Sequence, residues 1–331
     1  MINKLSIKVV IYCIIICFSI VAVGCSNDRT KVAYSGYTVV DAMGTTVHIP
    51  QKPKRILTLA MCTDSMVLGM LPTTNLVGIN NLADDPVSSN IVAKAKKIPL
   101  KIKDPSAEEI MALKPDLIIA TGWTGADKVS MMRELGFPVI VIPLITTLED
   151  IKQSINIIAA ALAEEEKGAE IINKMEQELT FIREKIAKIP ESSRKKVVLL
   201  SVMTTYGGSG CLFDDMCKYA GVENGIATAG IKNGQVLTKE MLVKINPDVL
   251  LLSSYNNHGT YDVSKFNNEY LQDPSLQTIT AIKTQNLKYP REGYTYNASQ
   301  DVVYGVRELA YCAYGKEFMQ DYDNHISVAP E

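Results

Sequence analysis

Short apolar runs alternate with stretches of helical periodicity along most of the chain. Ahead of them, residues 37–50, "YTVVDAMGTTVHIP", alternate apolar and polar positions around a Gly-containing turn, which predicts a β-hairpin. The apolar runs are 55–59, 76–79, 117–120 and 139–142 in a first series, and 195–203, 248–254 and 286–290 in a second. Strands that alternate with helices predict a mostly parallel sheet covered on both faces. The two series therefore predict an α/β protein with two lobes of like construction.

A long charged stretch separates the two series. Residues 164–188 carry a narrow apolar stripe at spacings of three and four: Ile171, Ile172, Met175, Leu179, Ile182 and Ile186. As one helix this stretch would span about 37 Å, and two helices broken near Gly168 are the alternative. We expect the continuous form, which gives an N-terminal lobe (37–163), a connector helix (164–189) and a C-terminal lobe (190–331). One rigid helical crossing restricts lobe motion more than a Gly/Ser linker would.

A stretch of the first series recurs in the second. "SAEEIMALKPDLIIATG" (106–122) aligns without gaps with "TKEMLVKINPDVLLLSS" (238–254). Most of the shared positions have a structural cause: an N-cap, a buried apolar pair, and a Pro that stops the helix before the strand. Glu109 completes a capping box with Ser106 that the second copy lacks. The shared acid is Glu108, matched by Glu240. A carboxylate that complements the helix dipole is one explanation for it, and a functional role is the other.

The N-terminus predicts export. Lys4 and Lys8 precede fifteen mostly apolar residues, 9–23, which would rise about 22 Å as a helix, less than the roughly 30 Å hydrocarbon core of a membrane. A permanent transmembrane anchor is the less favoured alternative to a signal peptide over 1–24. The tetrapeptide "AVGC" resembles a bacterial lipobox, although Ala22 stands where Leu is usual. The resemblance implies that Cys25 is lipidated and that 25–36 forms a tether to the outer face of the cytoplasmic membrane.

Composition excludes several classes of function. Cleavage after Gly24 changes the net charge from -2 to -4, so nothing attracts nucleic acid. Cys62, Cys211, Cys217 and Cys312 form no Cys-x-x-Cys pair and are expected to be small buried hydrophobes. Three scattered histidines make a site for bare zinc or manganese improbable, so no metal ligand is assigned. No nucleophile or phosphate-binding signature occurs, so the protein is not expected to be an enzyme.

Four motifs in order resemble the iron-complex and cobalamin substrate-binding proteins of bacterial ABC importers. They are the hairpin with "KRILTL", the stretch at 106–119, the connector helix and the second copy at 238–252, and the resemblance runs from Tyr37 to Phe318. In that family two lobes face each other across a cleft, and a glutamate on each lobe docks to arginines of the permease. The resemblance implies that Glu108 and Glu240 are those residues, and that the protein is a monomer.

Ligands of open parallel sheets lie beyond the carboxyl ends of the strands. The candidate cleft residues are Met61, Thr63 and Trp123 on the first lobe, and Tyr206, Tyr255, His258, Arg291, Tyr294 and Tyr296 on the second. Phenolate and imidazole can ligate iron, arginine can pair with an anionic siderophore, and aromatic rings can sandwich a macrocycle. For each tyrosine, and for Trp123, a packing role is the alternative. His48 and His325 are expected away from the cleft.

These features predict a lipid-anchored extracytoplasmic protein that delivers a ferric-siderophore-type metal chelate to an ABC importer permease. The chelate is a transported ligand and not an intrinsic cofactor. A corrinoid such as cobalamin is the first alternative ligand. Haem is the second, although Lys103 stands where haem-binding relatives place a ligand methionine. A sensory or adhesion lipoprotein that kept the fold is the alternative function. Ligand binding is expected to close the lobes by a small motion.

Overall fold

The computed structural model describes residues 36–321 and 323–330. The predicted signal peptide, Cys25 and the tether before Gly36 lie outside the described residues. The chain then begins with the predicted hairpin, β1 (Tyr37–Val40) paired antiparallel with β2 (Thr46–Ile49). The Asp41 carboxylate holds its turn, because it accepts hydrogen bonds from the N–H groups of Met43 and Thr45.

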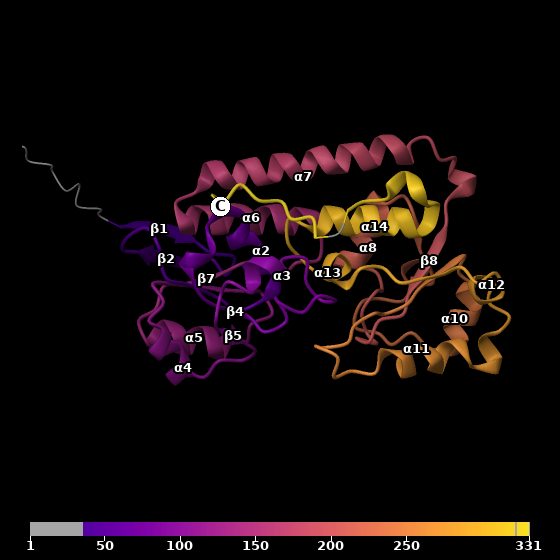
Figure 1. Ribbon diagram of the computed structural model, residues 1–331, viewed down its shortest axis with the longest axis horizontal. Helices are drawn as coiled ribbons and strands as arrows, with labels where there is room; N and C mark the ends of the chain where they lie inside the picture. The colour runs from indigo at the N-terminus through magenta and orange to yellow at the C-terminus, as the bar shows by residue number, and fades with distance from the viewer. Residues whose placement is uncertain (1–35, 322, 331) are drawn as a thin grey trace, which may run out of the picture. The chain divides into compact units, whose positions relative to one another are not determined.

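The N-terminal lobe is built on a five-stranded parallel sheet in the order β5-β4-β3-β6-β7 (Figure 1). Its elements are β3 (Ile56–Thr58), α2 (Met61–Met70), β4 (Leu76–Asn80), α3 (Val92–Ala95), β5 (Lys101–Ile102), α4 (Ala107–Leu113), β6 (Leu117–Ala120), α5 (Ala126–Glu134), β7 (Val139–Val141) and α6 (Leu148–Leu162). Apolar clusters cover both faces of the sheet, one against α2 and α6 and the other against α4 and α5. The predicted doubly covered parallel sheet is therefore confirmed.

The C-terminal lobe repeats this plan with a four-stranded parallel sheet in the order β11-β10-β8-β9. Its elements are β8 (Lys196–Leu199), α8 (Leu212–Tyr219), β9 (Glu223–Asn224), α9 (Gly225–Thr228), α10 (Lys239–Ile245), β10 (Val249–Leu251), α11 (Val263–Leu271), α12 (Thr280–Lys283), β11 (Leu287–Lys288), α13 (Glu292–Thr295) and α14 (Val302–Tyr314). Short 3-10 turns at Thr73–Asn75, Glu191–Ser193, Pro274–Leu276 and Lys316–Phe318 complete the chain. The edge strands β5 and β9 were not predicted.

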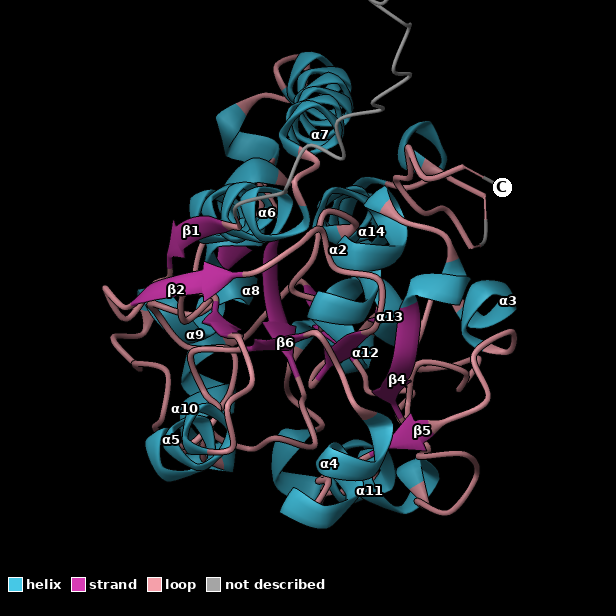
Figure 2. Ribbon diagram, turned by 90° about the vertical axis from the view of Figure 1, so that its left-hand side faces the viewer, coloured by secondary structure: helices cyan, strands magenta, loops and turns pink. Residues whose placement is uncertain are grey.

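The connector is one continuous helix, α7 (Glu165–Ile186), as predicted. Figure 2 shows α7 lying over α6. The helix continues through Gly168 without a break. A Cβ at that position would lie 2.6 Å from Cβ of Ala159 in α6. The glycine is what lets α6 and α7 approach. The predicted apolar stripe is buried, apart from the half-buried Ile172, in the cluster that covers the α7 side of both sheets.

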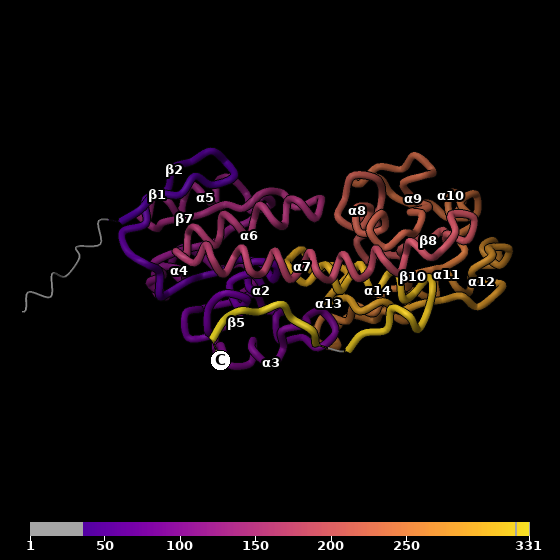
Figure 3. The backbone as a smooth tube through the Cα atoms, turned by 90° about the horizontal axis from the view of Figure 1, so that it is seen from above, coloured from indigo at the N-terminus to yellow at the C-terminus, as the bar shows by residue number. Residues whose placement is uncertain are grey.

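The C-terminal segment returns to the N-terminal lobe, which was not predicted. The backbone N–H of Val328 donates to the carbonyl of Gly69 in α2 at 2.7 Å, and Lys94 Nζ donates to Ser327 Oγ at 2.9 Å. In Figure 3 this yellow segment runs beside the N-terminal lobe. The lobes are therefore tied by this segment as well as by α7, a tertiary contact that local sequence does not encode.

The repeated stretch folds in the same way in both lobes. Ser106 and Glu109 form the predicted capping box, and Thr238 caps α10 without one. Each helix ends at a residue with positive φ directly before the Pro: Lys114 (φ 47) and Asn246 (φ 46). The Asp after that Pro accepts backbone hydrogen bonds at the start of the neighbouring strand, Asp116 from Arg55 and Asp248 from Lys196. The Pro-Asp pair therefore recurs because it joins a helix to a parallel sheet.

Candidate functional site

A cavity of about 380 Å³ lies between the two lobes, at the carboxyl ends of their strands. Most of its lining is apolar: Ala60, Met61, Cys62, Leu82 and Trp123 from the N-terminal lobe, and Val202, Met203, Tyr255, Tyr296 and Ala298 from the C-terminal lobe. Ser88, Glu292 and Asn297 supply the polar groups. An apolar cavity with a few placed polar groups is typical of a small-molecule site. We call it the cleft cavity.

Trp123 is presented by a tight turn after β6. The N–H of Thr124 donates to the carbonyl of Thr121 at 2.9 Å, and the N–H of Thr121 donates to Thr124 Oγ1 at 3.2 Å. A Cβ at Gly122 would lie 2.4 Å from the backbone N of Leu144, so only glycine lets the turn press against the segment after β7. The indole remains 52% exposed. The turn therefore offers a flat apolar face and one N–H donor to the cleft cavity.

The start of α2 supplies a second part of the cleft-cavity lining from the N-terminal lobe. Ala60, Met61 and Cys62 line the cleft cavity, but Thr63 does not. Thr63 is fully buried and its hydroxyl donates to the Ala60 carbonyl at 2.7 Å, so it stabilises the first turn of α2. Burial raises the pKa of the Cys62 thiol to about 12, which keeps it neutral. As predicted, Cys62, Cys211, Cys217 and Cys312 are free and buried.

Glu292 organises the C-terminal side. Its Oε1 accepts three hydrogen bonds, from Ser253 Oγ at 2.7 Å, from the N–H of Ser254 at 3.0 Å and from the N–H of Tyr255 at 3.1 Å. These bonds fix the loop that carries Tyr255 into the cleft cavity. Burial raises the pKa of Glu292 above its ordinary value, and the three hydrogen bonds oppose that shift.

Only one of the other predicted tyrosines lines the cleft cavity. Tyr296 does, and its ring lies 5.4 Å from that of Tyr206, which supports it from behind. Tyr294 is 1% exposed and its hydroxyl donates to the Asn324 carbonyl at 3.2 Å. Neither Tyr206 nor Tyr294 lines the cleft cavity: Tyr206 packs against Tyr296, and Tyr294 packs against Tyr304.

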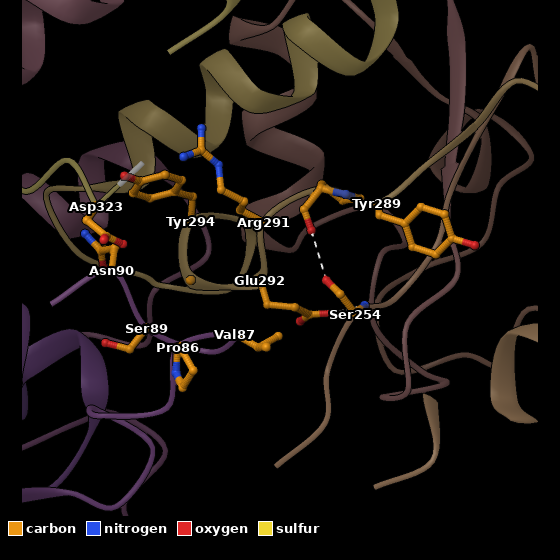
Figure 4. A pocket seen from close by; sticks show the side chains of 12 residues that line it. Pro86, Val87, Ser89, Asn90, Ser254, Tyr289, Arg291, Glu292, Tyr294 and Asp323 are labelled. Carbon is orange, nitrogen blue, oxygen red and sulfur yellow. Dashed lines mark hydrogen bonds between the residues drawn. The ribbon is translucent and has the colours of Figure 1, made fainter. Parts of the chain in front are cut away.

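Arg291 also points away from the cleft cavity. Its guanidinium donates to Glu308 Oε2 at 3.1 Å and to the Asp321 carbonyl at 2.8 Å. Figure 4 shows Arg291 directed towards α14, in the lining of a second cavity of about 230 Å³ that Glu292 also lines. The charge of Arg291 is therefore committed to Glu308, and pairing with an anionic siderophore would require breaking that contact.

His258 joins the two lobes. Its backbone N–H donates to Asp85 Oδ2 at 2.6 Å, and its Nε2 lies 2.9 Å from the Asn81 carbonyl. Nδ1 lies 3.5 Å from Asp85, and Asp84 lies 3.9 Å from Nε2. The imidazole is thus held at an interlobe contact. His48 is exposed on the hairpin, and His325 Nδ1 lies 2.7 Å from Asp301.

The sequence interpretation missed nine lining residues: Ala60, Cys62, Leu82, Ser88, Val202, Met203, Glu292, Asn297 and Ala298. Met203 is 51% exposed and lies in the loop after β8, but the sequence places it at the end of the predicted apolar run 195–203, so it was counted with the strand. Asn297 directly follows Tyr296 in a loop already expected at the cleft, so the rule used for the other loops could have found it, whereas the place of Ser88 depends on tertiary packing. Within the described ranges no group of three His, Cys, Asp or Glu could hold a metal ion.

Glu108 and Glu240 lie at matching places in the first turns of α4 and α10. Both are exposed, and neither forms an ion pair with another residue that the structure describes. Hydrogen bonds lower both pKa values, first from each residue's own backbone N–H and then from the hydroxyl of Ser106 or Thr238. Figures 1 and 2 place α4 and α10 on the side of their lobes away from α7.

Comparison with known proteins identifies the arrangement. Residues 56–292, well over half of the chain, match a family described as "Periplasmic binding protein". The chain belongs to this family. A solved periplasmic binding protein, MolA of Haemophilus influenzae bound to molybdate, superposes with a TM-score of 0.70 at 20% identity, over 85% of this chain and 92% of MolA. This likeness confirms the two-lobed fold.

Two curated relatives of this periplasmic binding protein come from Bacillus subtilis. YvrC, an uncharacterized ABC transporter substrate-binding lipoprotein, is 23% identical over 304 residues, which cover 89% of this chain and 91% of YvrC. The Fe(3+)-citrate-binding protein YfmC is 25% identical over 207 residues, which cover 60% of this chain and 58% of YfmC.

The family consists of substrate-binding proteins of ABC transporters, so this periplasmic binding protein is not an enzyme. Such proteins bind a small molecule outside the cytoplasm and work with a membrane permease. No helix in the described part of the chain has the length and apolar character needed to cross a membrane.

Proposed function

We propose that the protein captures a ferric-siderophore-type metal chelate in the cleft cavity and delivers it to an ABC importer permease. The lining carries the argument, because it comes from both lobes and joins an indole, two phenol rings and two thioethers. Flat apolar surfaces suit the organic shell of a chelate, whose metal is already coordinated. Coordination by the protein is then unnecessary.

The charge of the cavity lining restricts the net charge that a bound chelate can carry. None of the described residues that line the cleft cavity is Lys, Arg or His, and one is the carboxylate Glu292. A ferric ion held by three singly charged hydroxamates is neutral, whereas three doubly charged catecholates leave a trianion. Burying an unpaired anion beside Glu292 would be strongly unfavourable. We therefore propose a chelate without net negative charge.

A corrinoid is the second candidate, since its flat ring and uncharged amide periphery also suit Trp123 and an acceptor-rich wall. Haem fits less well, because its propionates would meet no cation among the described lining residues. Molybdate, which MolA binds, needs donors or cations that this lining does not supply in number.

Delivery requires a permease contact and a place at the membrane. We propose that Glu108 and Glu240 dock to permease arginines, since both are exposed, ionised and without an ion-pair partner in the described chain. We also propose that a signal peptide (1–24) is removed, that Cys25 is lipidated, and that the protein acts as a monomer. The relation to YvrC, itself a lipoprotein, supports the anchor.

Titration of the purified protein tests the ligand. A ferric trihydroxamate, a ferric tricatecholate, cobalamin, haem and molybdate are added separately while the fluorescence of Trp123, the only tryptophan, is recorded. We expect saturable quenching by the trihydroxamate and none by the tricatecholate or molybdate. Binding of cobalamin alone would favour the second candidate. If neither the trihydroxamate nor cobalamin binds, in fluorescence or in calorimetry, the ligand proposal is overturned.

A further inference from the structure

Three polar side chains that line the cleft cavity, Ser88, Tyr296 and Asn297, have a buried atom without a hydrogen-bond partner in the described chain, and the Tyr296 atom is its hydroxyl. Asn297 is 2% exposed and Ser88 is 7% exposed, and both line the cavity. Within the described chain, neither Asn297 Oδ1 nor Ser88 Oγ has a hydrogen-bond partner. A buried polar group without a partner is costly, so such groups in a cavity indicate what a ligand supplies.

The hydrogen-bond network behind Asn297 fixes its amide as an acceptor. Asn90 Nδ2 faces Asp301 Oδ2 and the Asn324 carbonyl, both at 2.8 Å, and both can only accept when Asp301 is ionised. Asn90 must therefore direct its NH₂ at them, which turns its Oδ1 towards Asn297. Asn297 Nδ2 donates to that oxygen at 3.0 Å and to Ser65 Oγ at 3.1 Å. The oxygen of Asn297 is consequently the atom left without a partner.

Glu292 adds a second acceptor to the same cavity. Its Oε1 is fully used by the loop at 253–255, as described above. Within 36–321 and 323–330 the hydrogen bonds that the Glu292 carboxylate accepts all end on Oε1, so the fold does not use its Oε2. The carboxylate therefore has a structural oxygen and an available one. With no cation in the described lining, the carboxylate and the Asn297 oxygen are its acceptors, the hydroxyls of Ser88, Tyr255 and Tyr296 can donate or accept, and the Trp123 indole N–H donates.

We propose that Asn297 Oδ1 and Glu292 Oε2 recognise an N–H donor on the periphery of the chelate, with an ammonium group preferred to a neutral amide. This inference rests on the proposed function and deepens it. It assigns these two residues to ligand specificity, and predicts that affinity rises with the positive charge and donor count of the peripheral group. Hydrogen bonds to charged groups are about twice as strong as those between neutral groups.

Three ferric trihydroxamates that differ at one end test the inference on the unaltered protein. One ends in a primary ammonium, one in its N-acetyl amide and one in its N-succinyl derivative, so their net charges differ by single steps. We expect the ammonium chelate to bind at least about tenfold more tightly than the succinyl chelate, with the acetyl chelate between them. Equal affinities would overturn the inference and leave the proposed function standing. Binding of none of the three would refute the proposed function itself.

Glu292→Gln tests the residue. Glutamine Oε1 can accept the same three hydrogen bonds, so the 253–255 loop should persist, while the available oxygen becomes an NH₂ donor. We expect the ammonium preference to fall to about a tenth or less, and the succinyl chelate to bind no more weakly than before. Glu269→Gln, an exposed change of equal charge on α11, should keep the preference. Retention of the neutral acetyl chelate shows that the Glu292 variant is folded.

A pH titration provides a readout that a purely structural role would not move. The Glu292 pKa is raised by burial, so its carboxylate is lost as pH falls through a value above the ordinary one. The ammonium preference should vanish over that range in the unaltered protein and be flat in Glu292→Gln. A preference that survives in Glu292→Gln, with the same pH profile, would overturn the assignment.

Discussion

A methyl group at Gly293 should act as a wedge between the lobes. Gly293 lies in α13, and its N–H donates to the Val87 carbonyl of the N-terminal lobe at 3.2 Å. A Cβ added there would lie 2.8 Å from the carbonyl carbon of Ser89 and 3.1 Å from the backbone N of Asn90. Ordinary contact begins at 3.4 Å, so the two backbones must separate by about 0.6 Å (3.4 minus 2.8). Backbone atoms cannot rotate out of the way as a side chain can.

The magnitude follows from overpacking, which costs about 1–3 kcal/mol. If the lobes separate to relieve the strain, this cost falls on the closed state, and chelate affinity should drop about 5- to 150-fold in Gly293→Ala. The melting temperature of the ligand-free protein should then change little. Trp123 fluorescence titration and a thermal melt measure the two effects separately. Gly125→Ala is the matched control, because a Cβ there meets nothing within 4 Å.

Unchanged affinity with a lower melting temperature would refute the reasoning. It would mean that the strain is taken up inside the fold and that the contact at Gly293 does not report on lobe closure.

Three further predictions concern the fold and its motion. Gly168→Ala should lower the melting temperature by a few degrees, because overpacking against Ala159 outweighs about 1 kcal/mol of helix propensity, and adding Ala159→Gly should restore most of the loss. Burial raises the pKa of Asp64 to about 7 from an unfolded value of 3.8, so between these pH values the folded state binds a proton that the unfolded state does not. Asp64 should therefore make the free energy of unfolding fall as pH rises from 4 to 7. Denaturant titrations of Asp64→Asn should lack this contribution to the slope. Because α7 and the C-terminal segment both tie the lobes, solution scattering of free and chelate-bound protein should reveal only a small change in radius of gyration, and a large hinge rotation would contradict the rigid connection.

Local patterns were sufficient for the elements and the lobes. The hairpin, the continuous helix α7 and the capping box at Ser106 follow from periodicity and cap chemistry within a few residues. The return of the C-terminal segment to α2 does not, because Val328 and Gly69 are far apart in sequence and neither carries a signal for the other.

The candidate site was predicted only in part, because some of its features follow from local sequence and others depend on long-range contacts. Met61, Trp123, Tyr255 and Tyr296 were found because they follow strands or lie in loops at the strand ends. Arg291 was expected at the cleft because its loop is there, but its direction depends on Glu308 of α14. The acceptor character of Asn297 depends on a chain of bonds through Asn90 to Asp301, which joins residues from both lobes.

The central claim is that ligand capture and delivery are separate tasks of one chain, the first in the cleft cavity and the second at Glu108 and Glu240. Reversing both charges, Glu108→Lys with Glu240→Lys, tests it when affinity for the trihydroxamate and cellular uptake of its radioactive iron are measured together. Glu134→Lys with Glu269→Lys, exposed on α5 and α11, is the control of equal charge. We predict that affinity stays within about twofold while uptake stops, and that the control keeps both. Lost affinity, or undiminished uptake, would contradict the account.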